Sequence, residues 1–132
     1  MREETVDSNV LIAALLKKDQ FYKEAYSKFQ EVLKGKAVYH ASRLVPVEVC
    51  GAINRIAGKT DAARAQIIMD SLIRKGSIKV YDLNESRMRQ ATNIALDYKL
   101  RGADAVITQI VQELKLPIIV YDNNIIKAAE NL

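Results

Sequence analysis

Short runs rich in β-branched and aromatic residues alternate with longer helical runs along the whole chain, and this alternation limits the possible folds more than any other feature. The strand-like runs are expected near residues 3–6, 37–41, 77–83 and 116–121. Strands that alternate with helices predict an α/β fold with a central, mostly parallel sheet flanked by helices. The last run is nearly continuously apolar, which is typical of a strand covered on both faces.

Helices are expected where apolar residues recur at intervals of three or four. Such patterns cover residues 10–18, 20–34, the stretch from Pro46 to Gly58, 60–75, the stretch after Asn84, 103–115 and a last segment from about Asn123. Ser42 and Asn84 have the side-chain oxygens of helix caps. With 132 residues and no internal repeat or linker, the chain is expected to form a single domain over residues 1–132.

The composition is that of a compact globular protein, with 49% hydrophobic and 27% charged residues. A formal net charge of +4 favours polyanionic partners without requiring them. Apolar stretches such as residues 10–16 are too short to span a bilayer, and no signal-peptide pattern opens the sequence. Cys50 is the only cysteine, so no intrachain disulfide can form. These features predict a cytoplasmic protein.

Four carboxylates are expected at one edge of the sheet, the carboxyl ends of the strands, where open parallel sheets bind ligands. Asp7 and Asp122 stand where the first and last strands should end. Glu48 and Asp104 stand in the first turns of two helices. Because each helix leaves from a strand end, helix starts lie at this edge too. The four side chains can therefore converge on one pocket.

Each acid also has a simpler explanation. An Asp or Glu in a first helical turn is favoured by the helix dipole, by about 0.3–1 kcal/mol, without any function. Asp7 and Asp122 can also act only as helix caps. Other acids, including Glu24, Asp61 and Glu85, are expected on polar helix faces or at helix starts. The joint placement of the four acids, rather than any one of them, therefore points to a function.

Four carboxylates that meet cannot all be ionised without a cation, because like charges raise one another's pKa. Oxygen ligands of this kind suit Mg²⁺ or Mn²⁺. A zinc site of the usual type is not expected, since the chain has one histidine and one cysteine. Acid clusters that hold one or two such ions hydrolyse phosphodiesters, because the metal activates a water and neutralises the charge that develops.

Four motifs resemble those of PIN-domain nucleases. They are Val-Asp-Ser-Asn-Val-Leu-Ile at 6–12, Val-Glu-Val at 47–49, Leu-Arg-Gly-Ala-Asp-Ala at 100–105 and Leu-Pro-Ile-Ile-Val-Tyr-Asp at 116–122. Each motif contains one of the four acids, and their order and approximate spacing match the family over essentially the whole chain. The resemblance implies a PIN-like three-layer sandwich and a metal-dependent endoribonuclease that uses Mg²⁺ or Mn²⁺.

Carried over residue by residue, the resemblance implies that Asp7, Glu48 and Asp104 are the principal metal ligands. It makes Asp122 a further ligand or an outer acid that orients metal-bound water. A lone PIN domain of this length is also similar to the VapC toxins of toxin–antitoxin pairs. That likeness implies a homodimer and a partner antitoxin that blocks the site.

Further residues are candidates for supporting roles. Asn9 matches the polar residue of the first motif and is expected to support its aspartate. Thr108, one helical turn beyond Asp104, either faces the same pocket or contacts a neighbouring carbonyl. Arg43 and Arg101 precede the second and third acids and are candidates for RNA contact, with solvated surface charge as the alternative.

The aromatic residues and the histidine are assigned structural roles. Tyr39 and Tyr121 are expected in strands and in the core, and Phe21 on the apolar face of the 20–34 helix. His40 is expected to be a structural strand residue rather than a base, because a bound metal can activate the water.

Two other functions are open. A PIN fold that has lost catalysis and only binds RNA or protein would account for two departures from the family pattern. These departures are the charged residues 2–4 that precede Thr5 and Val6 in the first strand, and Val120 where Ser or Thr is common. A phosphorylation-dependent receiver domain also gathers acids at a parallel sheet edge. It is disfavoured because Asp7 has no adjacent acid and no lysine ends the 118–121 strand.

Overall fold

A four-stranded parallel sheet forms the centre of the computed structural model, which describes residues 1–121, 128 and 130. Its strands are β1 (Arg2–Val6), β2 (Ala37–Ser42), β3 (Ile78–Tyr81) and β4 (Ile118–Ile119), in the order β3-β2-β1-β4. All neighbouring pairs are parallel, which confirms the predicted sheet. A receiver-type order would place β1 beside β3 instead of β4, so the receiver interpretation is wrong.

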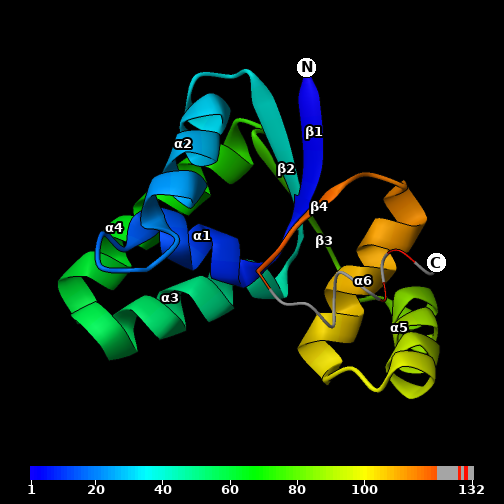
Figure 1. The fold of residues 1–132 in the computed structure, drawn as a ribbon. Helices are drawn as coiled ribbons and strands as arrows, with labels where there is room; N and C mark the ends of the chain where they lie inside the picture. Colours follow the sequence, from blue (N-terminus) through cyan, green and yellow to red (C-terminus); the bar gives the residue numbers. More distant parts are fainter. Residues whose placement is uncertain (122–127, 129, 131–132) are drawn as a thin grey trace.

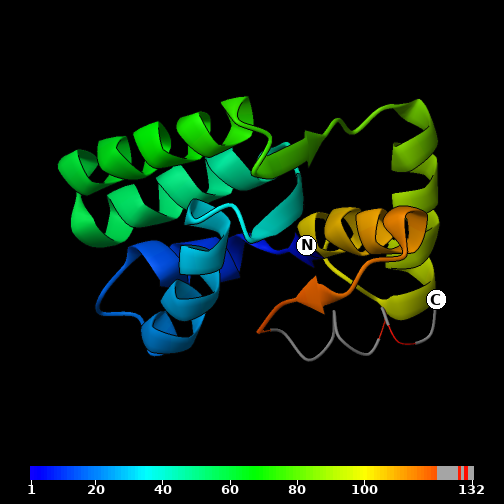
Figure 2. The ribbon, with the colours of Figure 1, turned by 90° about the horizontal axis from the view of Figure 1, so that it is seen from above.

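Six helices cover the two faces of the sheet in the described part of the chain. They are α1 (Ser8–Leu15), α2 (Tyr22–Leu33), α3 (Leu44–Ala57), α4 (Lys59–Arg74), α5 (Glu85–Tyr98) and α6 (Gly102–Leu114). Figures 1 and 2 show α1 to α4 on one face and α5 and α6 on the other, which confirms the three-layer sandwich. No helix in the described part combines the length and apolar character needed to cross a membrane. The helix expected from about residue 123 lies outside the described residues.

The main apolar core lies between the sheet and helices α1 to α4. Tyr39 of β2 and Phe29 of α2 are buried there, with ring centroids 6.5 Å apart. On the other face α6 packs across β1 and β2, and α5 packs on α6 through Ala91, Ile94 and Ala105. Each large side chain that is fully buried contributes roughly 1.5–3 kcal/mol. The α1–α4 side therefore supplies most of the apolar stabilisation.

Helix boundaries follow the capping residues expected from the sequence. The Asn84 side chain accepts a hydrogen bond of 2.9 Å from the backbone N–H three residues ahead, at the start of α5. The Ser42 hydroxyl accepts one of 3.1 Å from the N–H of Leu44, the first residue of α3. Gly58, with φ of 92°, ends α3 in a conformation that favours glycine and leads directly into α4.

Strand β1 forms over its whole expected length despite its charged start. Arg2 makes ion pairs with Glu4 in the same strand and with Glu31 of α2. Thr5 and Val6, at the other end, are buried. The charged half therefore lies toward the surface while the apolar half leads into the first motif, and the departure from a fully hydrophobic first strand does not prevent strand formation.

Strand β4 contains two residues, fewer than the predicted 116–121 run. It lies at the edge of the sheet, and the preceding Pro117 has no N–H to donate, although its carbonyl accepts a hydrogen bond of 2.8 Å from β1. Ile119 packs in the main core, while Ile118 and Val120 pack on the α6 side. The expected coverage of both faces is therefore confirmed, although the ladder is shorter.

Candidate active site

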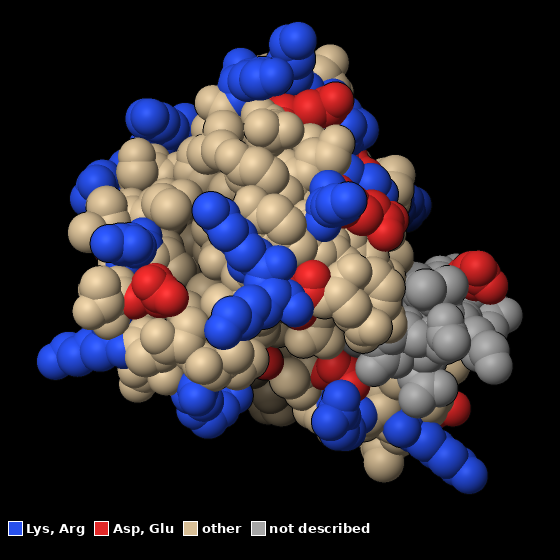
Figure 3. All heavy atoms as spheres, turned by 60° about the vertical axis from the view of Figure 1, so that its left-hand side comes forward, with Lys and Arg blue, Asp and Glu red and all other residues tan. Residues whose placement is uncertain are grey.

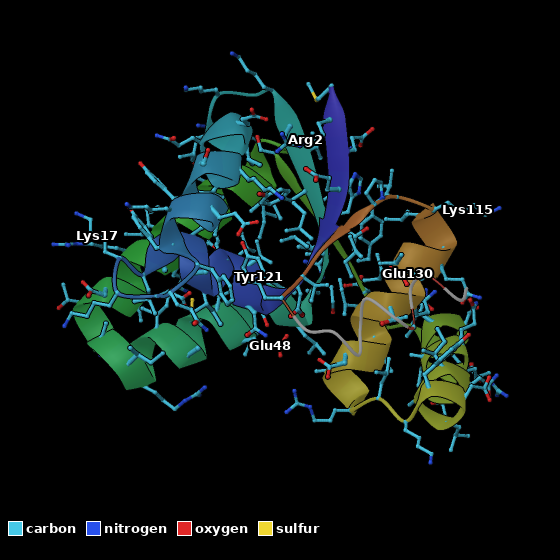
Figure 4. All side chains as sticks on the ribbon, viewed as in Figure 1. Arg2, Lys17, Glu48, Lys115, Tyr121 and Glu130 are labelled. Carbon is cyan, nitrogen blue, oxygen red and sulfur yellow. The ribbon has the colours of Figure 1, made fainter. Side chains whose placement is uncertain are left out.

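Three of the four candidate acids, Asp7, Glu48 and Asp104, lie at the carboxyl edge of the sheet. Asp7 directly follows β1, Glu48 belongs to the helix that follows β2, and Asp104 lies at the start of α6. Figure 4 shows Glu48 at this end of the sheet and Arg2 at the opposite end. The fourth acid, Asp122, lies outside the described residues.

The charges of Asp7 and Asp104 act on Glu48. Burial is the largest factor that raises the pKa of the Glu48 carboxyl, and the negative charges of Asp7 and Asp104 raise it further. Like charges shift a pKa in this way when they lie near each other in a poorly solvated place. The fold therefore brings together three carboxylates that are separated by 41 and 56 residues of sequence.

A capping hydrogen bond does not explain Asp7, and the helix dipole does not explain Glu48. Asp7 is 7% exposed and occupies the cap position of α1, yet its side chain accepts no capping hydrogen bond from that fully described helix. Helix α3 begins at Leu44 rather than at Pro46, so Glu48 lies past the first turn and its predicted first-turn position is wrong. The helix dipole acts mainly within that first turn.

Asp104 lies in the first turn of α6, as predicted, and has a cationic neighbour. Its Oδ2 accepts a hydrogen bond of 3.3 Å from Nε of Arg101. The Asp104 side chain is 16% exposed, whereas the Arg101 side chain is 84% exposed. Ion pairs of such exposed residues contribute about 1 kcal/mol or less. Arg101 can therefore exchange this contact for a phosphate at little cost.

Thr108 supports the backbone at Asp104. Its hydroxyl, in a fully buried side chain, donates a hydrogen bond of 2.8 Å to the Asp104 carbonyl oxygen. Of the two roles expected for Thr108, the structure shows the contact with a neighbouring carbonyl. Asn9, in contrast, is exposed on α1 and lines a small cavity together with the loop that follows that helix.

Arg43 lies at the end of β2 and forms an ion pair with Asp82, which follows β3. Both side chains are largely exposed. Arg43 and Arg101 therefore place two cations at the same edge of the sheet as the acids, where a polyanion would have to approach.

The chemistry of the three acids fits a hard divalent cation, because all of their side-chain donors are carboxylate oxygens. Within the described residues, no three acidic, histidine or cysteine side chains are gathered tightly enough to surround an ion. The side chains of Asp7, Glu48 and Asp104 would therefore have to move closer to one another to coordinate one metal ion. A cation that draws them together would also relieve the repulsion that raises the pKa of Glu48.

His40 has the structural role expected for it. It is buried in β2, where its Nδ1 lies 2.7 Å from the Tyr81 hydroxyl and its Nε2 lies 2.8 Å from a carboxylate oxygen of Glu3. These contacts join β1, β2 and β3 on the side of the sheet that α6 covers. Both ring nitrogens of His40 therefore have a hydrogen-bonding partner within the sheet.

Two aromatic residues were misplaced by the sequence-based prediction. Tyr121 lies beyond β4 rather than in a strand, although it is half-buried and packs against the main core as expected. Phe21 precedes α2, and its ring stacks on Tyr121 with centroids 4.2 Å apart and an interplanar angle of 20°. A usable signal was present, since Tyr121 immediately precedes one of the four candidate acids.

Comparisons with known proteins agree with this arrangement. The family model of the PIN domain matches residues 5–131. The fold is similar to that of VapC20 from Mycobacterium tuberculosis, a toxin that cleaves the sarcin–ricin loop. The TM-score is 0.76 at 19% sequence identity, and the match covers 94% of this chain and 93% of that chain. It is also similar to VapBC2 from Rickettsia felis bound to a DNA fragment from their promoter, with a TM-score of 0.69, 12% identity, and coverage of 98% and 95%. No curated protein sequence shows significant similarity. The chain belongs to the PIN-domain family.

Proposed function

We propose that this protein is a metal-dependent endoribonuclease and the toxin component of a VapBC-type toxin–antitoxin pair. The observation that carries the proposal is the convergence of Asp7, Glu48 and Asp104 at the carboxyl edge of a PIN fold. The similarity of the fold to VapC20, a toxin that cleaves the sarcin–ricin loop, supports RNA as the substrate.

Asp7, Glu48 and Asp104 would hold Mg²⁺ or Mn²⁺, with Asp122 as a further ligand or as the acid that orients the attacking water. The ion, when bound, lowers the pKa of that water and neutralises charge on the phosphate. The first of these acids directly follows β1, a strand held by hydrogen bonds to both neighbouring strands, so the acids would hold the ion on a rigid element. Asn9 and Thr108 would support the first and third acids.

RNA must approach the acids despite their charge, and basic residues at the edge would assist. Arg43 and Arg101 flank the acids, and the chain has a net charge of +4. Lys and Arg side chains also predominate over acidic ones on the face of α1 to α4 that Figure 3 shows. Cations near the phosphate path increase affinity by releasing counterions. The two arginines are therefore the proposed RNA contacts.

An antitoxin partner is supported by the fold's similarity to VapBC2 and by an apolar groove. A cavity of about 660 Å³ lies between the end of α1, the end of α3 and the start of α4. Leu15, Leu16 and Ile56 line it, and Lys17 and Arg64 stand beside them. Apolar surface with a charged rim is characteristic of a protein-binding site. An antitoxin segment with apolar and acidic residues would match this groove.

The proposal includes a homodimer and a cytoplasmic location, as expected for a toxin of this class. Leu44, Leu83 and Met88 are exposed around a second apolar cavity of about 390 Å³, between the start of α3 and the α5–α6 pair. Exposed apolar side chains gathered in this way favour association with another protein surface. A second copy of the chain is the occupant that the VapC likeness suggests.

The nuclease proposal is tested by incubating the purified protein with RNA and Mg²⁺ or Mn²⁺, beside Asp104→Asn. We expect cleavage that a chelator abolishes and that the variant lowers by at least about 100-fold, because loss even of a group that only orients a metal ligand costs roughly 10–100-fold. Asp97→Asn, which removes an exposed acid of α5, is the matched control and should cleave normally. Cleavage that survives both the chelator and Asp104→Asn would contradict the proposal.

A PIN fold that only binds RNA or protein is the second candidate. It is favoured by the absence, among the described residues, of three acids drawn tightly together. Titration calorimetry with Mn²⁺ separates the two functions. Binding of Mn²⁺ that Asp104→Asn removes supports the nuclease, whereas RNA binding without any uptake of metal would support the binding module.

A further inference from the structure

A small cavity of about 230 Å³ opens beside the acidic edge of the sheet. It lies between the start of α1, the loop from α1 to α2 and the end of β4, and it is lined by Asn9, Ile12, Asp19, Gln20, Phe21 and Tyr121. Backbone contacts place it next to the acids. The Asp7 N–H donates a hydrogen bond of 3.3 Å to the Ile119 carbonyl, while Asn9 and Tyr121 each lie two residues further along.

One wall of this cavity is an aromatic stack. The rings of Phe21 and Tyr121 lie 4.2 Å apart and nearly parallel, and Phe21 is 36% exposed. A stacked pair in which one ring is partly free presents a flat, polarisable surface to solvent. Planar aromatic ligands bind such surfaces by adding a further ring to the stack.

The loop that carries Phe21 is held in place by its own hydrogen bonds. The Asp19 carboxylate accepts a bond of 2.9 Å from the Phe21 N–H, and the Asp19 carbonyl accepts one of 3.1 Å from the Tyr22 N–H. These bonds start α2 at Tyr22 and leave Phe21 outside the helix. Phe21 therefore stacks on Tyr121, which follows β4, and does not join the core that contains the buried apolar residues of α2.

The polar groups of the cavity favour a neutral ring over a phosphate. The negative charges of Glu24 and Asp19 reach the site, since they raise the pKa of Tyr121 beyond the effect of burial. A phosphate would be repelled there. The side-chain amides of Asn9 and Gln20 offer both donors and acceptors, and the Asp19 carboxylate accepts from amino groups. Such groups complement the hydrogen-bonding edge of a nucleobase.

The size of the cavity agrees with a single ring system. Sites for drug-sized ligands occupy roughly 300–1,000 Å³, so a space of about 230 Å³ suits a smaller group. Enzymes that act on single-stranded RNA commonly stack unpaired bases on aromatic side chains. A base in this cavity would leave its own phosphate near the edge where the acids gather.

We propose that this cavity binds the base of an unpaired nucleotide that flanks the cleaved phosphodiester, with Phe21 as the stacking surface and Asn9, Asp19 and Gln20 as the groups that read its edge. Base binding itself needs no metal. Only the position of the nucleotide beside a cleaved bond rests on the proposed nuclease function. Asp19 selects for bases with an exocyclic amino group, so uracil is the base that this site binds least well.

The test measures RNA binding in the presence of a chelator, where no cleavage occurs. Phe21→Trp supplies the chain with its only tryptophan, placed on the stack. Short single-stranded oligoadenylate should quench its fluorescence, and an abasic oligomer of equal charge should not. Phe21→Leu should weaken the binding of oligoadenylate by about 10-fold, the loss expected when one base stack is removed.

Tyr22→Leu is the matched control, because Tyr22 also belongs to a stacked pair, with Tyr26 at 5.2 Å, but does not line the cavity. This variant should bind oligoadenylate like the unmodified protein. Equal binding of the abasic and base-bearing oligomers, or unchanged affinity in a folded Phe21→Leu variant, would overturn the proposal. Quenching by a partner protein but not by RNA would overturn it too, and would assign the cavity to protein recognition.

The two proposals fail separately. If Phe21 governs base binding but no metal-dependent cleavage is found, the nuclease function is wrong and the base site stands. If Asp104→Asn abolishes cleavage while Phe21→Leu changes neither RNA affinity nor the cleavage position, the base site is wrong and the nuclease stands.

Discussion

The carboxylate of Glu48 shows why the acidic edge of this sheet favours a cation. Its charged form is disfavoured by burial and by the neighbouring charges of Asp7 and Asp104. The anionic form of Glu48 is therefore less stable beside these two acids than it would be alone in water. A divalent cation bound there would reverse the sign of this interaction, so metal binding would stabilise the folded protein.

Thr108 offers a residue-level test of how Asp104 is held. Because its hydroxyl donates to the Asp104 carbonyl inside α6, Thr108→Val should destabilise the protein by roughly 0.5–1.5 kcal/mol, the net contribution of one hydrogen bond. RNA cleavage at saturating metal should change by no more than a few-fold, since the Asp104 carboxylate is untouched. Thermal unfolding and cleavage rates measured on the same samples check both parts. A loss of cleavage as large as that of Asp104→Asn would mean that Thr108 acts in the pocket itself.

Helices α5 and α6 form a unit that is joined to the end of β3 by one arginine. Arg87 of α5 donates two hydrogen bonds to Glu113 of α6, at 3.0 and 2.9 Å, and one of 2.9 Å to the Asp82 carbonyl. Its guanidinium also lies 5.4 Å from the ring centroid of Tyr81. Since α6 carries Asp104, this contact helps to fix the third acid relative to the sheet.

The Arg87–Glu113 pair predicts acid sensitivity of the α5–α6 unit. Hydrogen bonds from Arg87 and then Gln109 lower the pKa of Glu113 below its ordinary value of 4.5. A carboxyl with a lowered pKa contributes stability that is fully present above the ordinary value and is lost as the pH falls through the lowered one. Glu113→Gln should therefore lower the free energy of unfolding at pH 7 by about 1 kcal/mol or less, and the difference should shrink at pH values below about 4.

Denaturant unfolding of both proteins at several pH values measures this difference. Glu85→Gln is the control, because Glu85 pairs with Arg89 within α5 and both side chains are largely exposed. It should change stability less than Glu113→Gln at pH 7. A Glu113→Gln effect that stays constant down to pH 3 would show that charge on Glu113 is not its origin.

Most elements could be predicted from periodicity and capping residues, and the differences have local causes. The start of α2 was placed at Gln20 because Phe21 fits the apolar pattern, but the side chain and carbonyl of Asp19 fix the turn that ends at Tyr22. The length of β4 was overestimated because apolar content does not reveal that a strand lies at the sheet edge behind Pro117. The first difference comes from the hydrogen bonds of Asp19 and the second from the place of β4 in the sheet, and the apolar pattern encodes neither.

The places of Asp7 and Asp104 in the fold were predictable because one follows a strand and the other begins a helix. Asp7 and Asp104 occupy the predicted positions, and Glu48 differs by a helix start two residues earlier. The mutual approach of the acids depends on the order β3-β2-β1-β4, which the sequence alone does not determine. The Phe21–Tyr121 stack was missed for the same reason, since it joins two segments that are 100 residues apart.

For the molecule as a whole, two cavities lined by apolar residues are the candidates for contact with other proteins. One is the groove with basic neighbours between α1, α3 and α4, which we assign to the antitoxin. The other is the cavity between the start of α3 and the α5–α6 pair, around Leu44, Leu83 and Met88. Because the second cavity is lined by Ala103 and Ala105, on either side of Asp104, a dimer formed there would bring two acidic edges toward one another.

The dimer prediction is tested by placing a charge in the second cavity. Met88 is 45% exposed, so Met88→Lys can keep the monomer folded while it introduces a cation that a dimer would have to desolvate. We expect the dissociation constant of the dimer, measured by analytical ultracentrifugation, to rise by at least about 10-fold, which corresponds to 1.4 kcal/mol. Ile67→Lys changes an exposed apolar residue of α4, away from this cavity, and should leave the dimer intact. If Ile67→Lys dissociates the dimer and Met88→Lys does not, the subunits meet through the α4 side, and the cavity at Met88 is free for another partner.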